Sequence, residues 1–199
     1  MKIYIVLLFV LPISKQLCAQ YSLSDAQLHK DQYFFSNFTS YKINKRLGIF
    51  MFGSLDRDQY DIAPGILLSS NPAGGLKKYW ELGIGGGATL SRNTSAKPYW
   101  YAQMYGWFET KPDQQLSKGK IISQCSPSFT FNSDDPWWML GYVTYAATKN
   151  IAVGVHFQSE SAKGIRLEYN IAAGKHGIIR WYTVLGSGAL GGMSYIFQK

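Results

Sequence analysis

The chain has 199 residues, with 20 Lys and Arg against 12 Asp and Glu, so its formal net charge is +8. Hydrophobic residues make up 46% of it, aromatic residues 16% and charged residues only 16%, which excludes a disordered chain and favours one domain rich in strands and turns. Beyond the N-terminus, no apolar run approaches the roughly 20 residues of a membrane-spanning helix, which excludes a helical membrane protein.

The N-terminus has the three parts of a secretory signal peptide: a positive charge at Lys2, an apolar stretch from Ile3 to Ile13, and a small residue at Ala19. We therefore expect residues 1–19 to be removed on export. Cleavage leaves Cys125 as the one cysteine, so no internal disulfide is expected. The remaining basic balance suits lipopolysaccharide or other anionic lipid better than nucleic acid.

Residues 20–45 are predicted to be a polar N-terminal segment, with one extra strand possible over Gln32–Lys42. From about Arg46 onward, segments of alternating polarity follow one another between clusters of Gly, Asn, Asp, Pro or Lys, with no helical period. Pro127 predicts a bulge in one of these segments. The alternation predicts strands over residues 47–55, 60–69, 79–91, 99–109, 121–132, 137–148, 151–160, 165–173, 178–185 and 191–198.

The pattern and the short connectors predict an all-β fold, a single antiparallel up-and-down barrel of about ten strands, within a range of 8–12. Alternation alone fits either a soluble lipocalin-like binding barrel or a transmembrane barrel. Two features favour the membrane form: the segments are long for a soluble sheet, and aromatic residues gather near their ends. These aromatic pairs are Tyr79-Trp80, Tyr99-Trp100, Trp107-Phe108, Trp137-Trp138 and Trp181-Tyr182.

These segments resemble the outer-membrane β-barrel proteins of Gram-negative bacteria, over residues 46–199. Their final strand usually alternates, is rich in aromatic residues and ends on one. Here Met193 to Lys199 alternates in this way, although Phe197 lies two residues before the end. The resemblance implies an outer-membrane location with lipid and lipopolysaccharide as partners, and it extends to the class only, not to a narrower family.

The polar faces of the predicted strands supply the candidate site. In a barrel of this size they would line the interior, where charges of both signs either fill the lumen as ion pairs or form a constriction that a small hydrophilic solute passes or binds. An aromatic row from Tyr99 to Trp107 faces either the same interior or the lipid. The predicted lumen-lining residues are Glu81, Gln124, His156, Gln158, Glu160, Arg166, Glu168, Asn170 and Arg180.

Three other motifs give weaker predictions. Asp56 to Asp61 has alternate acids but lacks the glycine and distal glutamate of a calcium loop, so we interpret it as a solvated turn, with weak cation binding as the alternative. Gly83 to Gly87 is interpreted as small residues that let a strand coil or make room for a bulky neighbour. The three His and one remaining Cys lack the spacing of metal ligands, and no cofactor is expected.

An enzyme is the less favoured function. Barrel lipid A deacylases place a Ser two residues after a His, whereas Gln158 follows His156 at that spacing. The favoured function is a small pore or lumenal binding protein for hydrophilic solutes, or a structural barrel. A lipid-modifying barrel enzyme and a soluble lipocalin-like binder remain alternatives, and the oligomeric state is left open.

Overall fold

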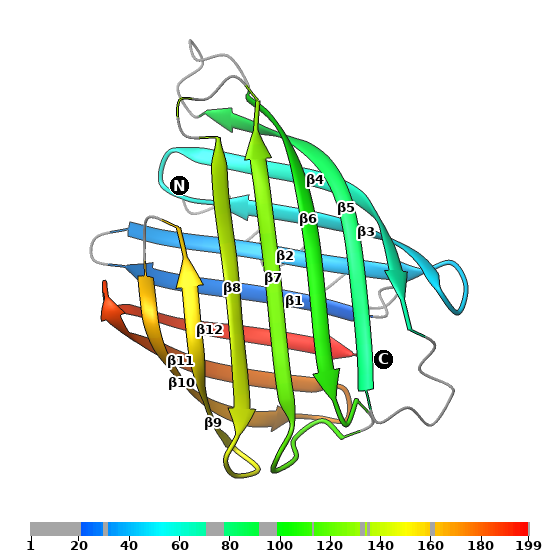
Figure 1. The fold of residues 1–199 in the computed structure, drawn as a ribbon, viewed down its shortest axis with the longest axis vertical. Helices are drawn as coiled ribbons and strands as arrows, with labels where there is room; N and C mark the ends of the chain where they lie inside the picture. The colour runs from blue at the N-terminus through cyan, green and yellow to red at the C-terminus, as the bar shows by residue number, and fades with distance from the viewer. Residues whose placement is uncertain are drawn as a thin grey trace.

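The computed structural model describes residues 21–29, 32–70, 78–91, 99–112, 114–131, 134, 136–159 and 162–198. The expected signal peptide lies outside these residues. Within them, twelve strands form one closed antiparallel barrel (Figure 1). The strands are β1 (Tyr21–His29), β2 (Gln32–Lys42), β3 (Leu47–Leu55), β4 (Gln59–Ser69), β5 (Lys78–Ser91), β6 (Tyr99–Thr110), β7 (Ile121–Thr130), β8 (Trp137–Ala146), β9 (Ile151–Gln158), β10 (Ala162–Ala173), β11 (Gly177–Ser187) and β12 (Leu190–Gln198).

Each strand pairs with the next along the chain, and β1 pairs with β12, so that Tyr21 lies opposite Gln198 and the sheet closes. This confirms the predicted up-and-down barrel. Strand β2 has the bounds of the possible extra strand, Gln32–Lys42, whereas β1 was not predicted, so the barrel begins within the expected polar segment 20–45. The outer wall of β1 has little apolar character, since Leu28 is its one exposed large apolar residue. No helix in the described ranges is long and apolar enough to cross a membrane.

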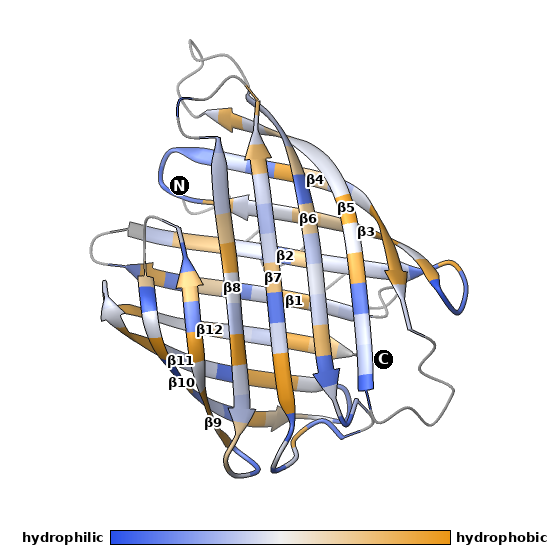
Figure 2. Ribbon diagram, viewed as in Figure 1, coloured by the Kyte–Doolittle hydropathy of each residue, from blue (hydrophilic) through white to orange (hydrophobic). Residues whose placement is uncertain are grey.

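The two faces of the wall differ in polarity, as the alternating colours along the strands show (Figure 2). On β10, Ile165 and Leu167 are exposed on the outside, while Arg166 and Glu168 between and beside them are buried. Elsewhere on the outer wall, Ile84 and Val155 are 64% and 62% exposed. Apolar residues therefore face out, which is the reverse of a soluble lipocalin-like barrel and the arrangement of a membrane barrel.

Pro127 does not produce the predicted bulge. Along β7 the pairing with β8 keeps one register from Ile121 to Phe129, with Pro127 opposite Met139. Towards β6 the pairing stops around Pro127 and resumes in the same register at Cys125. Because proline lacks an N–H, the ladder loses hydrogen bonds on one side without an inserted residue. The bulge prediction is therefore wrong.

The glycines of β4 and β5 receive an aromatic ring from β3. A Cβ at Gly65 would lie 2.2 Å from the Phe50 ring, and a Cβ at Gly83 or Gly85 would lie 2.9 Å from it. At these distances a residue larger than glycine would overlap the Phe50 ring unless the ring moved. The interpretation as room for a bulky neighbour is thus confirmed for Gly83 and Gly85, and that neighbour is Phe50, whereas Gly86 and Gly87 lie against backbone atoms.

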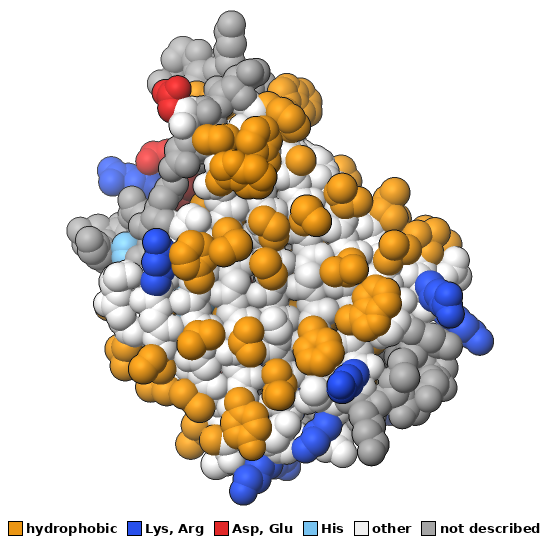
Figure 3. Space-filling model, in the orientation of Figure 1, with side chains coloured by type: hydrophobic (Ala, Val, Ile, Leu, Met, Phe, Trp, Pro, Cys, Tyr) orange, Lys and Arg blue, Asp and Glu red, His pale blue; other side chains and the backbone are white. Residues whose placement is uncertain are grey.

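Charge is divided between the two ends of the barrel. The terminal end holds the start of β1 and the end of β12, and the far end lies opposite. Figure 3 shows most Lys and Arg side chains along the lower and right margins and Asp or Glu at the upper left. Basic residues of the terminal end are Lys42, Lys45, Arg46, Lys78, Lys111, Lys118, Lys120, Lys149 and Lys175, beside the acidic Glu109. Acidic residues of the far end are Asp56, Asp58, Asp61 and Asp134, beside the basic Arg57 and Lys163.

Candidate functional site

Aromatic rings cross the middle of the lumen. Phe38 on β2 stacks on Tyr105 of β6 with ring centroids 4.3 Å apart, and Tyr21 on β1 lies 5.9 Å from Trp107 of β6. Phe50 joins them from β3, 5.3 Å from Phe38. Strands β2 and β6 are separated in the wall by three others, so these contacts bridge the interior. The aromatic row of β6 therefore faces inward at Tyr105 and Trp107.

An ionic cluster fills the opposite side of the same level. Arg166 Nε lies 2.6 Å from Glu168 Oε1, and Arg180 Nε lies 3.3 Å from Glu168 Oε2. All three side chains are buried. One carboxylate is thus shared by two guanidinium groups. Each of these buried charges is stable only while its partner is present, because an unpaired charge in a low-dielectric interior is strongly destabilising.

Neutral groups hold the two arginines. The Arg166 guanidinium lies between two rings, 4.3 Å from the centroid of Tyr142 and 3.7 Å from that of Tyr182. Its Nη1 donates to His156 Nδ1 at 3.2 Å. Arg180 donates to Asn170 Oδ1 at 3.0 Å and to the Tyr142 hydroxyl at 3.3 Å.

This network unites five of the predicted lumen residues, His156, Arg166, Glu168, Asn170 and Arg180. The guanidinium of Arg166 occupies His156 Nδ1, so that nitrogen accepts a hydrogen bond. The structure therefore gives these residues a packing and ion-pairing role.

The other predicted residues are distributed around the wall. Glu81 lies on β5 and accepts a hydrogen bond from the Tyr79 hydroxyl. Gln124 on β7 donates to Ser126 Oγ at 3.4 Å. Gln158 is buried near the far end of β9. Glu160 lies outside the described residues.

We call the level at which these aromatic rings and the ionic cluster lie the crossing layer. Beneath the far end, a small cavity remains inside this layer. Its volume is about 50 Å³, and its lining includes Asp25, Tyr105, Gln124 and Arg166. Asp25 accepts hydrogen bonds there from Tyr182 at 2.9 Å and from Ser194 at 2.7 Å. A small space with hydrogen-bonding groups in its lining is suited to ordered water.

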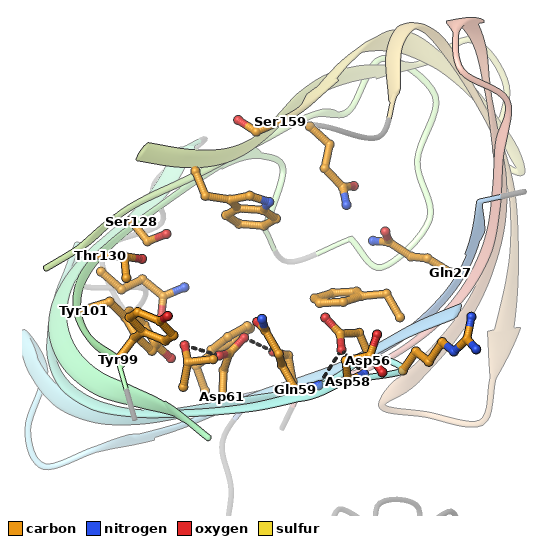
Figure 4. Close-up of a pocket in the computed structure, with 18 of the residues that line it drawn as sticks. Gln27, Asp56, Asp58, Gln59, Asp61, Tyr99, Tyr101, Ser128, Thr130 and Ser159 are labelled. Carbon is orange, nitrogen blue, oxygen red and sulfur yellow. Dashed lines mark hydrogen bonds between the residues drawn. The ribbon is translucent and has the colours of Figure 1, made fainter. Parts of the chain in front are cut away.

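A much larger cavity, which we call the vestibule, opens at the far end. Its volume is about 620 Å³, within the range of roughly 300–1,000 Å³ usual for small-molecule sites. Figure 4 shows Gln27 and Asp61 reaching into it from different parts of the wall. The lining is Gln27, His29, Tyr33, Phe34, Phe52, Ser54, Asp56, Arg57, Asp58, Gln59, Asp61, Thr89, Tyr99, Tyr101, Gln103, Ser128, Thr130, Trp137, Trp138, Gln158, Ser159 and Leu190.

Several polar atoms in the vestibule wall are buried without a hydrogen-bond partner in the described part of the chain. They are Gln27 Oε1, His29 Nε2, Tyr101 Oη, Gln103 Oε1 and Gln158 Oε1. Asp61, by contrast, accepts from Ser54 at 2.6 Å and from Thr89 at 2.7 Å, which fixes its carboxylate. A fixed acid beside unpaired amide and hydroxyl groups is a lining that a polar solute or water would complete.

Most vestibule residues were not predicted as site residues. Asp56 to Asp61 was interpreted as a solvated turn, although a strand was also predicted from residue 60; Asp61 belongs to β4 and faces the vestibule. Gln27 lies on β1, which the alternation did not reveal, and only Gln158 was predicted. For the part of the vestibule lining on β6, the alternation that includes Tyr101 and Gln103 was the one sequence feature that could have predicted it. No group of three or more His, Cys, Asp or Glu side chains among the described residues could hold a metal ion.

Comparisons with known proteins show the fold. No protein-family model matches the sequence, and no curated protein matches it. Among solved structures, one titled "KdgM porin" matches with a TM-score of 0.53 and 7% identity, covering 90% of this chain and 99% of that one. Another, titled "KdgM porin in complex with disordered oligogalacturonate", matches with a TM-score of 0.55 and 8% identity over the same shares. The resemblance to outer-membrane β-barrels is therefore confirmed at the level of the fold.

Proposed function

We propose that this chain is an outer-membrane β-barrel protein that binds a small hydrophilic solute in its far-end vestibule, above a lumen closed to free passage. One observation carries the proposal. A polar cavity of about 620 Å³ lies directly over a level where side chains from non-neighbouring strands touch across the barrel. Such a lining favours a bound polar solute over a purely structural barrel.

The outer-membrane location is supported by the outer wall. Exposed apolar side chains such as Leu82 and Ile165 cover its strands, and Trp80 and Trp181 are exposed among them. So much exposed apolar surface is unfavourable in water and favourable against acyl chains. The structural likeness to porins supports the same location.

The crossing layer argues against a permanently open pore. An ion crossing this level would have to part the Phe38 and Tyr105 rings or the pairs that Glu168 makes with Arg166 and Arg180. The expected behaviour is therefore solute binding without conductance.

Three measurements test the proposal. The detergent-extracted protein should migrate anomalously on gels until boiled, and in planar bilayers it should show no stable single-channel current. Disaccharides should quench or enhance tryptophan fluorescence in a saturable way through Trp138, which lines the vestibule. Trp138→Phe should remove most of that response, whereas Trp181→Phe, on the outer wall, should leave it.

Each outcome has a distinct meaning. Stable conductance in the wild type would replace the binding function with a pore. Absence of both conductance and any saturable response would leave the structural barrel, which the contacts across the lumen favour as the second candidate. Recovery in the soluble fraction without heat-modifiable migration would overturn the membrane location.

A further inference from the structure

We infer that the vestibule takes a positively charged solute with several hydrogen-bond donors, in preference to a neutral or anionic solute of the same size. This inference deepens the proposed function and rests on it. It depends on the charge, the unpaired polar atoms and the aromatic rings of the vestibule lining.

The charge of the lining is the first observation. Among the described lining residues, three carboxylates, on Asp56, Asp58 and Asp61, face one guanidinium, on Arg57. Asp58 is exposed in the turn between β3 and β4, so its charge is available at the entrance. Asp61 lies deeper and is held by the Ser54 and Thr89 hydroxyls. A low-dielectric wall strengthens the field of such charges inside the cavity.

The unpaired polar atoms are the second and independent observation. Gln27, Gln103 and Gln158 are 5%, 5% and 6% exposed, and the amide oxygen of each has no hydrogen-bond partner in the described residues. Figure 4 shows Gln27 pointing into the cavity. Each oxygen is an acceptor, and a buried acceptor without a donor costs free energy. Once the terminal amides turn into the cavity, a solute that supplies N–H or O–H groups would satisfy these oxygens together with the carboxylates.

Aromatic side chains complete the lining. Tyr99, Tyr101 and Trp138 come from β6 and β8 and border the same space. Aromatic faces attract cations within about 6 Å of the ring centroid and also pack against apolar faces of sugar rings. An amine-bearing sugar or a similarly hydroxylated organic cation combines the three features that the lining favours.

The ligand of one structural neighbour, oligogalacturonate, has the opposite charge to the solute inferred for this vestibule. Oligogalacturonate carries a carboxylate on every ring, and three lining carboxylates would repel it. Like charges brought together at an interface are strongly disfavoured. The vestibule of this chain therefore has the opposite charge preference to that expected of a polyanion site.

The test uses three disaccharides of similar size in mildly acidic buffer: a β-1,4-linked glucosamine disaccharide, cellobiose and digalacturonate. Binding to the detergent-solubilised full barrel is measured by isothermal titration calorimetry at low and high salt. The glucosamine disaccharide should bind tightest and digalacturonate weakest, and the dissociation constant should rise about fivefold for each unit of positive charge that the sugar lacks. Added salt should narrow the gap, because it screens the charges at the mouth.

Variants locate the effect. Asp58→Asn and Asp61→Asn should each weaken glucosamine-disaccharide binding about fivefold and leave cellobiose binding nearly unchanged. Asp134→Asn removes an acid at the same end of the barrel but outside the vestibule lining, so it should have no effect on either sugar. Gln103→Leu should weaken both sugars, because it removes an uncharged acceptor from the wall.

Two kinds of failure are distinguishable. If cellobiose or digalacturonate binds as tightly as the glucosamine disaccharide, or Asp134→Asn acts like Asp58→Asn, the charge preference is wrong while the vestibule remains a binding site. If none of the three disaccharides binds, the proposed binding function itself fails.

Discussion

Glu168 is the residue on which the interior charge balance depends. Its carboxylate neutralises Arg166 and Arg180, which are both buried beside it. Glu168→Gln should therefore destabilise the folded barrel by roughly 3–5 kcal/mol, because it leaves two guanidinium groups in a low-dielectric interior. The loss is measurable as a lower temperature of conversion from the fast-migrating to the unfolded form on gels.

A second variant separates lost charge pairing from lost packing. Glu168→Gln combined with Arg166→Gln removes one charge of each sign and should recover part of the stability lost by Glu168→Gln alone. A double variant that is as unstable as the sum of both single variants would show that the carboxylate does not serve to neutralise Arg166.

Val155 and Gln158 test the assignment of faces on one strand. Val155 is exposed on the outer wall of β9, whereas Gln158 lines the vestibule. Val155→Arg should impair assembly, since an arginine facing lipid near the midplane costs roughly 2–4 kcal/mol. Gln158→Arg should impair assembly less, because the guanidinium of the new arginine can reach the open vestibule. Equal yields of folded protein in the membrane fraction would contradict this assignment.

At this scale the sequence predicted the interior better than the site. Alternation placed Arg166, Glu168 and Asn170 on one face, because a period of two needs no knowledge of neighbouring strands. It could not show that Phe38 meets Tyr105 across the lumen, since that contact depends on barrel closure. The vestibule was missed for the same reason: Gln27 and Gln103 lie on strands far apart in the sequence.

At the scale of elements, β3, β4 and β5 pack through one ring in a glycine-lined space. Gly83→Ala would bring a Cβ within 2.9 Å of Phe50 and 3.2 Å of Leu67, both through side-chain atoms. We expect a loss of about 1–3 kcal/mol from this overpacking. Phe50→Leu in the same chain should restore much of it by vacating the ring's place.

The matched control for this prediction is Gly86→Ala. Gly86 lies on the same strand, but its Cβ would meet only a backbone oxygen, at 3.4 Å. Its effect on the conversion temperature should be small. Equal losses for Gly83→Ala and Gly86→Ala would indicate a backbone requirement for glycine along β5, and not the fit of Phe50.

Strand prediction succeeded where the outer wall is apolar and failed where it is not. The strands from β3 to β12 agree with the predicted segments because large apolar residues recur along each, and β2 agrees with the possible extra strand over Gln32–Lys42. Strand β1 carries Ser24, Asp25 and Gln27 in its centre, and their pattern gains meaning only beside β2 and β12. Pairing with neighbouring strands thus determines that β1 is a strand, although its own pattern of polar and apolar residues did not predict one.

At the scale of the whole molecule, Cys125 reports on the surroundings of the barrel. It is exposed on the outer wall in the middle of β7, between the buried Gln124 and Ser126. In membranes, a water-soluble maleimide should label it very slowly, because acyl chains cover that position. After unfolding in denaturant the same reagent should label it completely.

The control is a cysteine moved to the turn between β8 and β9. Lys149→Cys in a Cys125→Ser background should react rapidly in intact membranes, since Lys149 is exposed in a turn at the terminal end. Rapid labelling of Cys125 itself in the folded state would show that water reaches the outer wall and would contradict the membrane location.

The pairing of β1 with β12 makes the order of the strands cyclic. Tyr21 and Gln198 are direct neighbours, so a short linker between them would add only a turn like the others. A circularly permuted chain, joined there and opened at residues 188–189 between β11 and β12, should build the same wall. The fold of this barrel would then depend on which strands are neighbours in the wall, and not on the order in which the strands are synthesised.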